Sequence, residues 1–444
     1  MSSPTTGRRL TSLLVVLALV GAPALVLRAF CIGRSCDDAS ATVAPVPFCP
    51  LPTDLRALIA AGFRAGRSPD VMATSGGTPV VSKVPGELVG WPWMGASPSG
   101  TVPLAFVGSG VARGALPAGV GLADVAPTLA ALIGYTPPHP DVRVGRAISG
   151  LEPSASGPAP LAVEIVWKGI GTDDLEGRWP RATGALIRDG GAGTLRAAVG
   201  SLPADPAAIL TTVGTGGLPS QHGITGTDLR ADGGNVARAW TSAAPESVIT
   251  TLPDELDHSF GEQARVGLVA TDDTDRGLIG DGWSVGTDRD DVVVAPADPV
   301  RATEHLLNSG YGADGVPDVL GVVLRGPLHR MDTRTAAIAD AVQRRIPDAV
   351  IAVTATGSLA ASGTQAARAI SAADVARAVN RALRARVIEA DVAGGFFLNP
   401  AELAAAGLSA GAVVQTMSGQ TDRSGAPLFA DAYPGFSVAF DRYC

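Results

Sequence analysis

Three carboxylates that could bind a cation lie close together in the segment TDDTDRGLIGDG, which begins at Thr271. Asp272, Asp273 and Asp275 can present several oxygen atoms at once, and hard cations such as Ca²⁺ take clustered carboxylate oxygens as ligands. Their spacing departs from the ligand pattern of an EF-hand loop. We therefore expect a solvated loop here, with a calcium loop as the alternative.

Other residues that could take part in binding or catalysis are isolated in the sequence. His222, in PSQHGI, could be a metal ligand or a packed core histidine. Trp91 and Trp93, in WPWMG, could form a ligand platform or fill a corner between prolines. The 444 residues contain no Ser-x-x-Lys, Gly-x-Ser-x-Gly or P-loop motif. The residue types alone therefore indicate no established nucleophile or phosphate-binding loop.

The elements that must position these residues are short apolar strands separated by helical stretches. Strands of continuous Val, Ile and Leu that alternate with helices indicate an α/β fold, with a mostly parallel sheet covered on both faces. Asp205, followed by Pro206, is expected to cap a helix. The expected strands include 102–111, 161–171, 264–270, 291–297, 317–324 and 348–358, and the expected helices include 51–63, 180–189, 333–345 and 372–385.

Composition narrows the functional classes. The chain is 46% hydrophobic and 17% charged, with 55 Gly and 34 Pro, as in a globular protein with many turns. Its formal net charge of -8 does not favour broad binding to the negatively charged backbone of nucleic acids. We expect no nucleic-acid partner.

The N-terminus predicts export. Arg8 and Arg9 precede an apolar run from Leu10 to Leu27, and such a positive flank places the start of the chain in the cytoplasm and the remainder outside. About 18 apolar residues suit either a cleaved signal peptide or a signal anchor. We assign residues 1–30 to this segment and residues 31–50 to a linker rich in Ala, Pro, Ser and Val.

The cysteines agree with an oxidising compartment. Cys31, Cys36 and Cys49 cluster early, and Cys444 is the last residue. No histidine or second close cysteine pair accompanies them, so a metal site is not expected. Four cysteines allow three disulfide connectivities.

Four segments resemble the alkaline phosphatase superfamily, especially its type I phosphodiesterase/nucleotide pyrophosphatase-like members. TGGLPSQHGI resembles the family's TG…P…HGI segment, in which the histidine is structural. LAVEIVWKGIG resembles its opening strand, and DAVIAVTATGS resembles the strand that usually ends in Asp-His-Gly. VPLAFVGSGV, followed by DVAPTLAALIGYTPP, resembles its closing segment.

The order of these segments differs from that of the family. The closing segment precedes the opening strand here, and residues 370–444 resemble the cap that normally lies between the Asp-His-Gly strand and the closing segment. The resemblance therefore implies a circular permutation, which exposed joints and neighbouring termini tolerate. On this reading a Cys49–Cys444 disulfide would tie the new ends together and leave Cys31 to pair with Cys36. A separate N-terminal module is the alternative.

The resemblance implies an α/β core over residues 51–369 and a small α+β cap over 370–444. Residues 51–150 of the core would correspond to the family's C-terminal segment.

Family members hydrolyse phosphate or sulfate esters with two metal ions roughly 4 Å apart, and the matching residues are poorly kept. The opening strand should end in a metal-binding Asp but ends in Lys168. The nucleophile should stand about nine residues before Thr215, which falls on Pro206. The Asp-x-x-x-His motif becomes Arg325 to His329, and Asp-His-Gly becomes Ala-Thr-Gly. Added positive charge disfavours a bound dication.

These departures predict a non-catalytic protein that holds no metal or cofactor. In the former cleft, an anionic small molecule, an envelope polymer or a membrane-associated protein would bind near Lys168, Asp205, Arg325 and His329. A divergent hydrolase that uses the Asp272–Asp275 loop and a purely structural envelope protein are the alternatives.

Overall fold

The structure is a computed structural model, which describes residues 47–85, 87–94, 100–261, 263–280, 290–357 and 369–444. The expected signal segment, most of the expected linker, and Cys31 and Cys36 lie outside these residues. Everything described below belongs to one compact unit, Val46–Cys444. No helix built from the described residues has the length and apolar character needed to cross a membrane.

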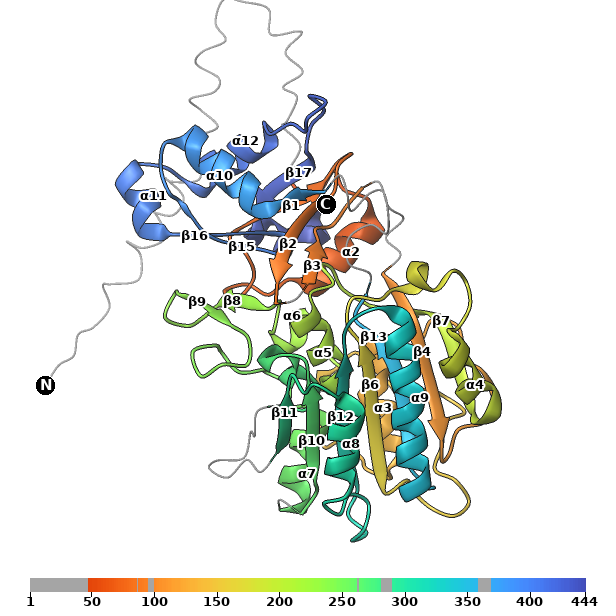
Figure 1. Cartoon of the computed structure of the whole chain (residues 1–444). Helices are drawn as coiled ribbons and strands as arrows, with labels where there is room; N and C mark the ends of the chain where they lie inside the picture. Colours follow the sequence, from red (N-terminus) through yellow and green to blue (C-terminus); the bar gives the residue numbers. More distant parts are fainter. Residues whose placement is uncertain (1–46, 86, 95–99, 262, 281–289, 358–368) are drawn as a thin grey trace, which may run out of the picture. The chain divides into compact units, whose positions relative to one another are not determined.

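A large sheet of eight strands forms the centre of the fold (Figure 1). Its five neighbouring strands β11, β10, β12, β6 and β13 are parallel, β4 runs antiparallel to β13, and β7 runs antiparallel to β4. The bounds in sheet order are β11 Asp291–Val294, β10 Val266–Ala270, β12 Asp318–Leu324, β6 Leu161–Trp167, β13 Val350–Ala355, β4 Thr101–Gly108, β7 Gly191–Ala198 and β5 Gly114–Ala115. The central strands are buried along their whole length, as the continuous apolar runs predict.

Helices cover both faces of this sheet. On one face lie α4 (Arg181–Gly190), α8 (Pro299–Leu307) and α9 (Leu328–Arg345). On the other lie α3 (Val125–Leu132), α5 (Pro206–Thr215) and α7 (Leu252–Phe260), together with the 3-10 helix η4 (Asp273–Leu278). The predicted α/β fold with a mostly parallel, doubly covered sheet is therefore present.

Two smaller sheets lie outside the large one and build a second hydrophobic cluster. One sheet has the order β15-β16-β1-β17 and the other β14-β2-β3. Their bounds are β1 Val71–Ser75, β2 Val80–Val84, β3 Glu87–Gly90, β14 Ile370–Ser371, β15 Ile388–Val392, β16 Gly395–Leu398 and β17 Phe429–Pro434. The helices α10 (Ala372–Leu383), α11 (Pro400–Ala406) and α12 (Ala410–Ser418) accompany them.

Residues 71–90, which the resemblance assigned to the core, thus pair with strands of the C-terminal segment. β1 lies between β16 and β17 and is antiparallel to both. A five-residue buried run has the same pattern in either sheet, so the sequence could not tell which partner β1 would take.

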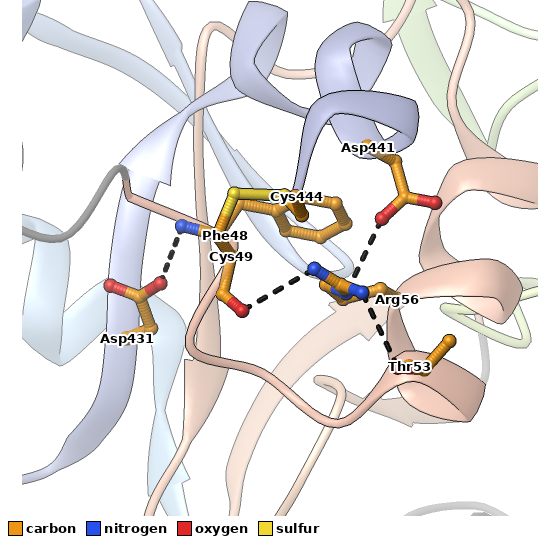
Figure 2. Close-up of a disulfide and its surroundings, with 7 residues drawn as sticks. All are labelled: Phe48, Cys49, Thr53, Arg56, Asp431, Asp441 and Cys444. Atoms are coloured by element: carbon orange, nitrogen blue, oxygen red, sulfur yellow. Dashed lines mark hydrogen bonds and ion pairs between the residues drawn. A yellow bond between two sulfur atoms is a disulfide. The ribbon is translucent and has the colours of Figure 1, made fainter.

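The chain ends are joined where residues 47–50 meet the C-terminal 3-10 helix η6 (Gly435–Tyr443). A disulfide links Cys49 to Cys444, 395 residues apart, as the resemblance implied (Figure 2). Phe48 is fully buried and packs against Tyr433, so the last residues of the expected linker belong to the folded body. The helix α2 (Thr53–Gly62) begins a few residues later and packs against η6.

The remaining elements are short. They are the helix α6 (Pro219–His222), the hairpin of β8 (Asp228–Arg230) and β9 (Val236–Arg238), and the 3-10 turns η1 (Leu122–Asp124), η2 (Pro140–Val142) and η3 (Thr172–Leu175).

Candidate functional site

The carboxyl edge of the parallel strands is the place where this fold can gather side chains from distant parts of the chain. β6, β10, β12 and β13 end at Trp167, Ala270, Leu324 and Ala355. In open α/β sheets, ligands bind in the crevice outside these carboxyl ends. The residues that follow the four strands therefore form the candidate site.

Lys168 follows β6 directly, and its ammonium is held by its own protein. Nζ lies 2.8 Å from Oδ2 of Asp272, 2.6 Å from Oδ1 of Asp275 and 3.2 Å from Oγ1 of Thr271. An ammonium has three N–H donors, so these three oxygens use all of them. Because only 2% of the side chain is exposed, a ligand has little access to it.

The acidic segment after β10 therefore has a different role from the solvated loop expected from the sequence. Asp275 is fully buried, and its Oδ2 accepts hydrogen bonds from the backbone N–H of Thr271 at 2.6 Å and from the Thr271 hydroxyl at 2.7 Å. Asp272 caps η4 by accepting from Thr274 N at 2.9 Å. Of the three carboxylates only Asp273 is exposed. The expectation was wrong for Asp272 and Asp275 because their partner, Lys168, lies more than 100 residues earlier in the chain.

The electrostatics of this cluster favour charge on Lys168 and on Asp272, whereas burial outweighs Lys168 at Asp275 and raises the pKa of that carboxyl. Burial lowers the pKa of Lys168, but Asp275 and Asp272 outweigh it and raise the pKa above its ordinary value. Burial raises the pKa of Asp272, but the charge and hydrogen bond of Lys168 and the hydrogen bonds of Thr274 bring it below its ordinary value. We refer to Lys168, Asp272 and Asp275 as the lysine cluster.

Asp205 takes the helix-capping role that the sequence predicted. Its Oδ1 accepts from Ala207 N at 3.0 Å and from the Thr227 hydroxyl at 2.9 Å, and Pro206 is the first residue of α5. All ten residues of α5 are buried. Complete burial raises the pKa of Asp205, and the hydrogen bonds from Thr227 and Ala207 oppose that shift. The cap leaves this helix start unsuited to an anion.

Glu87 was missed by the sequence reasoning. It lies at the start of β3 and is 7% exposed, and neither carboxylate oxygen has a hydrogen-bond partner among the described residues. Burial raises the pKa of Glu87 to about 7; Lys168 opposes this shift, whereas Asp275, Asp205 and Asp272 add to it. The carboxyl of Glu87 is therefore within electrostatic range of both the lysine cluster and the cap of α5. No local pattern in VPGELVG distinguishes it from an exposed hairpin residue.

Arg325 follows β12 and lines a hollow toward α8 and α9, whereas Asp272 and Asp275 of the lysine cluster lie at η4; Thr271 contributes to both places. The backbones are adjacent, since Lys168 N donates to Leu324 O at 2.9 Å. Trp167, which precedes Lys168, points to α9, where its Nε1 donates to Thr335 Oγ1 at 2.8 Å. Arg325 is exposed and lines a pocket of about 210 Å³.

We call this hollow the arginine pocket; it lies where β10, β11 and β12 end against α8 and α9. Its lining contains two guanidinium groups, those of Arg325 and Arg334, and no carboxylate. Neither guanidinium has a hydrogen-bond or ion-pair partner among the residues that the structure describes. The lining residues are Ala270, Thr271, Ala295, Pro296, Pro299, Val323, Leu324, Arg325 and Arg334.

His329 does not join the lining of the arginine pocket. It is exposed in the first turn of α9, and its carbonyl accepts from the Thr333 hydroxyl at 2.9 Å. Of the four residues proposed from the sequence, Lys168 and Asp205 lie around Glu87, and Arg325 lies in the arginine pocket. The sequence reasoning missed Arg334 because the orientation of α9 against the sheet, which the sequence does not show, decides which of its residues line the pocket.

A second hollow of about 500 Å³ lies between α8 and α9, away from the strand ends. Its lining includes Arg344 and Arg345 but also the carboxylate of Glu304, and Arg344 forms an ion pair with Asp340. These carboxylates make it a weaker anion site than the arginine pocket.

His222 has the structural role that the resemblance implied. The ring is fully buried, its Nδ1 accepts from Ile224 N at 3.1 Å, and its Nε2 lies 3.1 Å from the Thr212 hydroxyl. Burial, followed by the charges of Arg64 and Arg67, lowers the pKa of His222 to about 3. A neutral ring bonded on both nitrogens holds the turn after α6 against α5.

The tryptophans of WPWMG also pack rather than form a platform. Trp91 is buried beside Phe396 and Phe429, and its Nε1 donates to the Ser82 hydroxyl at 2.8 Å. The indole N–H of Trp93 donates to the Gly76 carbonyl.

Within the described ranges, no group of three or more His, Cys, Asp or Glu side chains is arranged to hold a metal ion.

Comparisons with known proteins give one distant structural likeness. No protein-family model matches the chain, and no curated protein matches it. Among solved structures, phosphonoacetate hydrolase from Sinorhizobium meliloti, in complex with phosphonoformate, superposes with a TM-score of 0.26 at 14% identity. The match covers 41% of this chain and 52% of that one, so the chain spans about half the length of its neighbour.

Proposed function

We propose that this chain is an exported, circularly permuted protein of alkaline-phosphatase type. It binds a small anion at the carboxyl edge of its sheet and does not hydrolyse esters by the family's two-metal route. The observation that carries the proposal is the contrast at this edge. All three donors of Lys168 are used within the protein, whereas the arginine pocket holds two guanidinium groups that have no partner among the described residues.

The lysine cluster supports the non-catalytic half of the proposal. The resemblance places a metal-binding Asp at the end of β6, where the ammonium of Lys168 stands between two carboxylates. A divalent cation at that point would meet a like charge in a buried, low-dielectric setting, which is strongly unfavourable. Pro206, at the position of the nucleophile, has no group that could attack phosphorus or sulfur.

The arginine pocket supports the binding half. Guanidinium groups present several N–H donors in a planar fork that suits phosphate, sulfate and carboxylate oxygens. A hollow of about 210 Å³ is small compared with typical pockets for drug-sized ligands, so we propose a single phosphate, sulfate or carboxylate group as ligand. Of the groups proposed from the sequence, Arg325 is kept as a donor, Lys168, His329 and the helix start after Asp205 are left out, and Arg334 is added.

Thermal-shift and calorimetric titrations with phosphate and sulfate test this half. We expect a saturable shift for the wild-type protein and a loss of about tenfold or more in affinity for Arg325→Ala and for Arg334→Ala, since each removes a charged hydrogen-bonding partner. Arg330→Ala, on the same helix but outside the pocket lining, is the matched control. Equal affinities in all four proteins would exclude the arginine pocket as the site.

Turnover tests the non-catalytic half. Purified protein supplied with Zn²⁺, Mn²⁺, Mg²⁺ or Ca²⁺ is incubated with generic phosphomonoesters, phosphodiesters and sulfate esters. We expect no hydrolysis above the protein-free rate. Turnover that a chelator abolishes would establish a divergent hydrolase instead.

Export rests on the arginine-flanked apolar run and on the Cys49–Cys444 disulfide, which suits an oxidising compartment. We propose that the apolar run remains attached as an anchor. Membrane fractionation and thiol labelling before and after reduction test this, with a membrane-bound chain and a protected Cys444 as the expected result.

A further inference from the structure

Three aromatic side chains are exposed together on η6. Phe436, Phe440 and Tyr443 are 65%, 52% and 68% exposed, and they are the only Phe or Tyr side chains that exposed in the described part of the chain. Successive ring centroids are 6.5 and 6.1 Å apart. We call these three residues the aromatic patch. Other large exposed apolar residues, such as Leu88 and Val294, lie on separate elements.

The aromatic patch belongs to a well-anchored element. Gly435, Ser437 and Val438 are buried on the opposite side of η6, and Val438 joins the cluster that contains Phe48 and Tyr433. Both ends of η6 are held: β17 precedes it, and the Cys49–Cys444 disulfide follows it. The exposed rings are therefore presented on a fixed support.

The charges beside the aromatic patch suit an anionic, partly apolar surface. Asp441 forms an ion pair with Arg56 at 3.3 Å, which offsets its negative charge (Figure 2). The guanidinium carbon of Arg442 lies 4.8 Å from the centroid of the Tyr443 ring. Aromatic rings with a flanking arginine are typical of segments that lie at the boundary between lipid headgroups and acyl chains.

The position of the aromatic patch along the chain indicates which surface it contacts. Cys49 is bonded to Cys444, the residue after Tyr443, so the described chain begins beside the patch. The apolar run ends at Leu27, 22 residues before Cys49 (49 − 27). A flexible chain of that length has an end-to-end distance of roughly 25 Å. An anchor in the membrane would thus hold this part of the protein close to the lipid surface.

We propose that the aromatic patch inserts into the interfacial layer of the lipid bilayer that holds the N-terminal apolar run. The inference rests on the export and anchoring part of the proposed function. Phe436 and Phe440 enter the acyl boundary, the Tyr443 hydroxyl stays at headgroup level, and Arg442 contacts lipid phosphate. The disulfide then holds Cys49, through which the N-terminal segment joins the folded body, next to the surface that touches the membrane.

The test uses the full chain with a protease site inserted between Ser40 and Ala41, reconstituted into vesicles of phosphatidylcholine with phosphatidylglycerol. After cleavage, the fraction of the released body that floats with the vesicles is measured. The variants are F436S/F440S and, as a matched control, L88S/V294S, which removes two exposed apolar side chains elsewhere. Thermal unfolding confirms that each variant is folded.

We expect the cleaved wild-type body to float with the vesicles. The partition coefficient should fall by about tenfold or more in F436S/F440S, because two phenyl rings are removed from the lipid contact, and should be unchanged in L88S/V294S. Hydrogen exchange at residues 435–443 should be slower in vesicles than in detergent.

Equal release of the wild-type and F436S/F440S bodies would overturn the proposal. So would lipid-free dimerisation that F436S/F440S abolishes, since the patch would then bind a second copy. An uncleaved chain that fails to float would refute the anchoring part of the proposed function. If the uncleaved chain floats but the wild-type body is released after cleavage, the anchoring part stands and the proposed lipid contact of the aromatic patch is refuted.

Discussion

The cationic side chains at the sheet's carboxyl edge, Lys168 in the lysine cluster and Arg325 with Arg334 in the arginine pocket, differ in what surrounds them. On one side, Lys168 is buried and bonded to two carboxylates. On the other, Arg325 and Arg334 line an open pocket that contains no carboxylate. A cation with all its donors satisfied stabilises the fold, and only one with unused donors can bind a ligand. This difference separates the structural half of the edge from the candidate binding half.

The largest expected effect is on the buried side. Lys168→Ala leaves Asp272 and Asp275 without their counter-charge in the interior, and breaking a buried ion pair in this way costs about 3–5 kcal/mol. The free energy of unfolding, measured in urea, should fall by that amount. A change below about 1 kcal/mol would show that the lysine cluster is not a stabilising element.

An intermediate effect is expected for Glu87, whose buried carboxylate has no hydrogen-bond partner among the described residues. Because burial raises its pKa to about 7, the folded state binds this proton more tightly than the unfolded state does. The group therefore stabilises the protein less as pH rises from the ordinary value toward 7, and the loss is complete above 7.

Glu87→Gln removes this dependence. Relative to wild type, the variant should gain stability between about pH 4.5 and 7 and keep a gain on the order of 2–3 kcal/mol above pH 7. Urea unfolding at a series of pH values checks this, with the exposed Glu402→Gln as control. A wild-type-minus-variant difference that stays constant with pH would mean that Glu87 does not titrate against the lysine cluster.

The smallest effect is expected on the open side. Arg325→Ala and Arg334→Ala should change the unfolding free energy by less than about 0.5 kcal/mol without added anion, since neither side chain has a charged partner to lose in the part of the chain that the structure describes. Phosphate that saturates the wild-type protein should then stabilise it more than it stabilises either variant. Destabilisation as large as that of Lys168→Ala would remove the distinction between the two sides.

The parts of this arrangement that depend on neighbouring residues could be predicted from the sequence. Asp205 caps α5 because its acceptor lies two residues before the donor in Ala207, and the apolar runs of β6 and β12 indicate buried strands by themselves. The Cys49–Cys444 pair followed from a resemblance that placed both ends of the chain beside one joint.

The parts that depend on distant contacts could not be predicted. Lys168 and Asp275 are 107 residues apart, so the sequence presented a lone lysine and an acidic loop instead of an ion pair. The burial of Glu87 and the partnership of β1 with β16 and β17 likewise require the sheets to be assembled first. Arg334 enters the pocket only because of the face that α9 turns toward the strand ends.

Metal content tests the central claim most directly, because an ammonium and a divalent cation cannot share the end of β6. Protein purified without chelators should contain less than about a tenth of an equivalent of tightly bound divalent metal by mass spectrometry of the elements, since the ammonium of Lys168 already stands between Asp272 and Asp275. Two tightly bound zinc ions per chain would contradict the account.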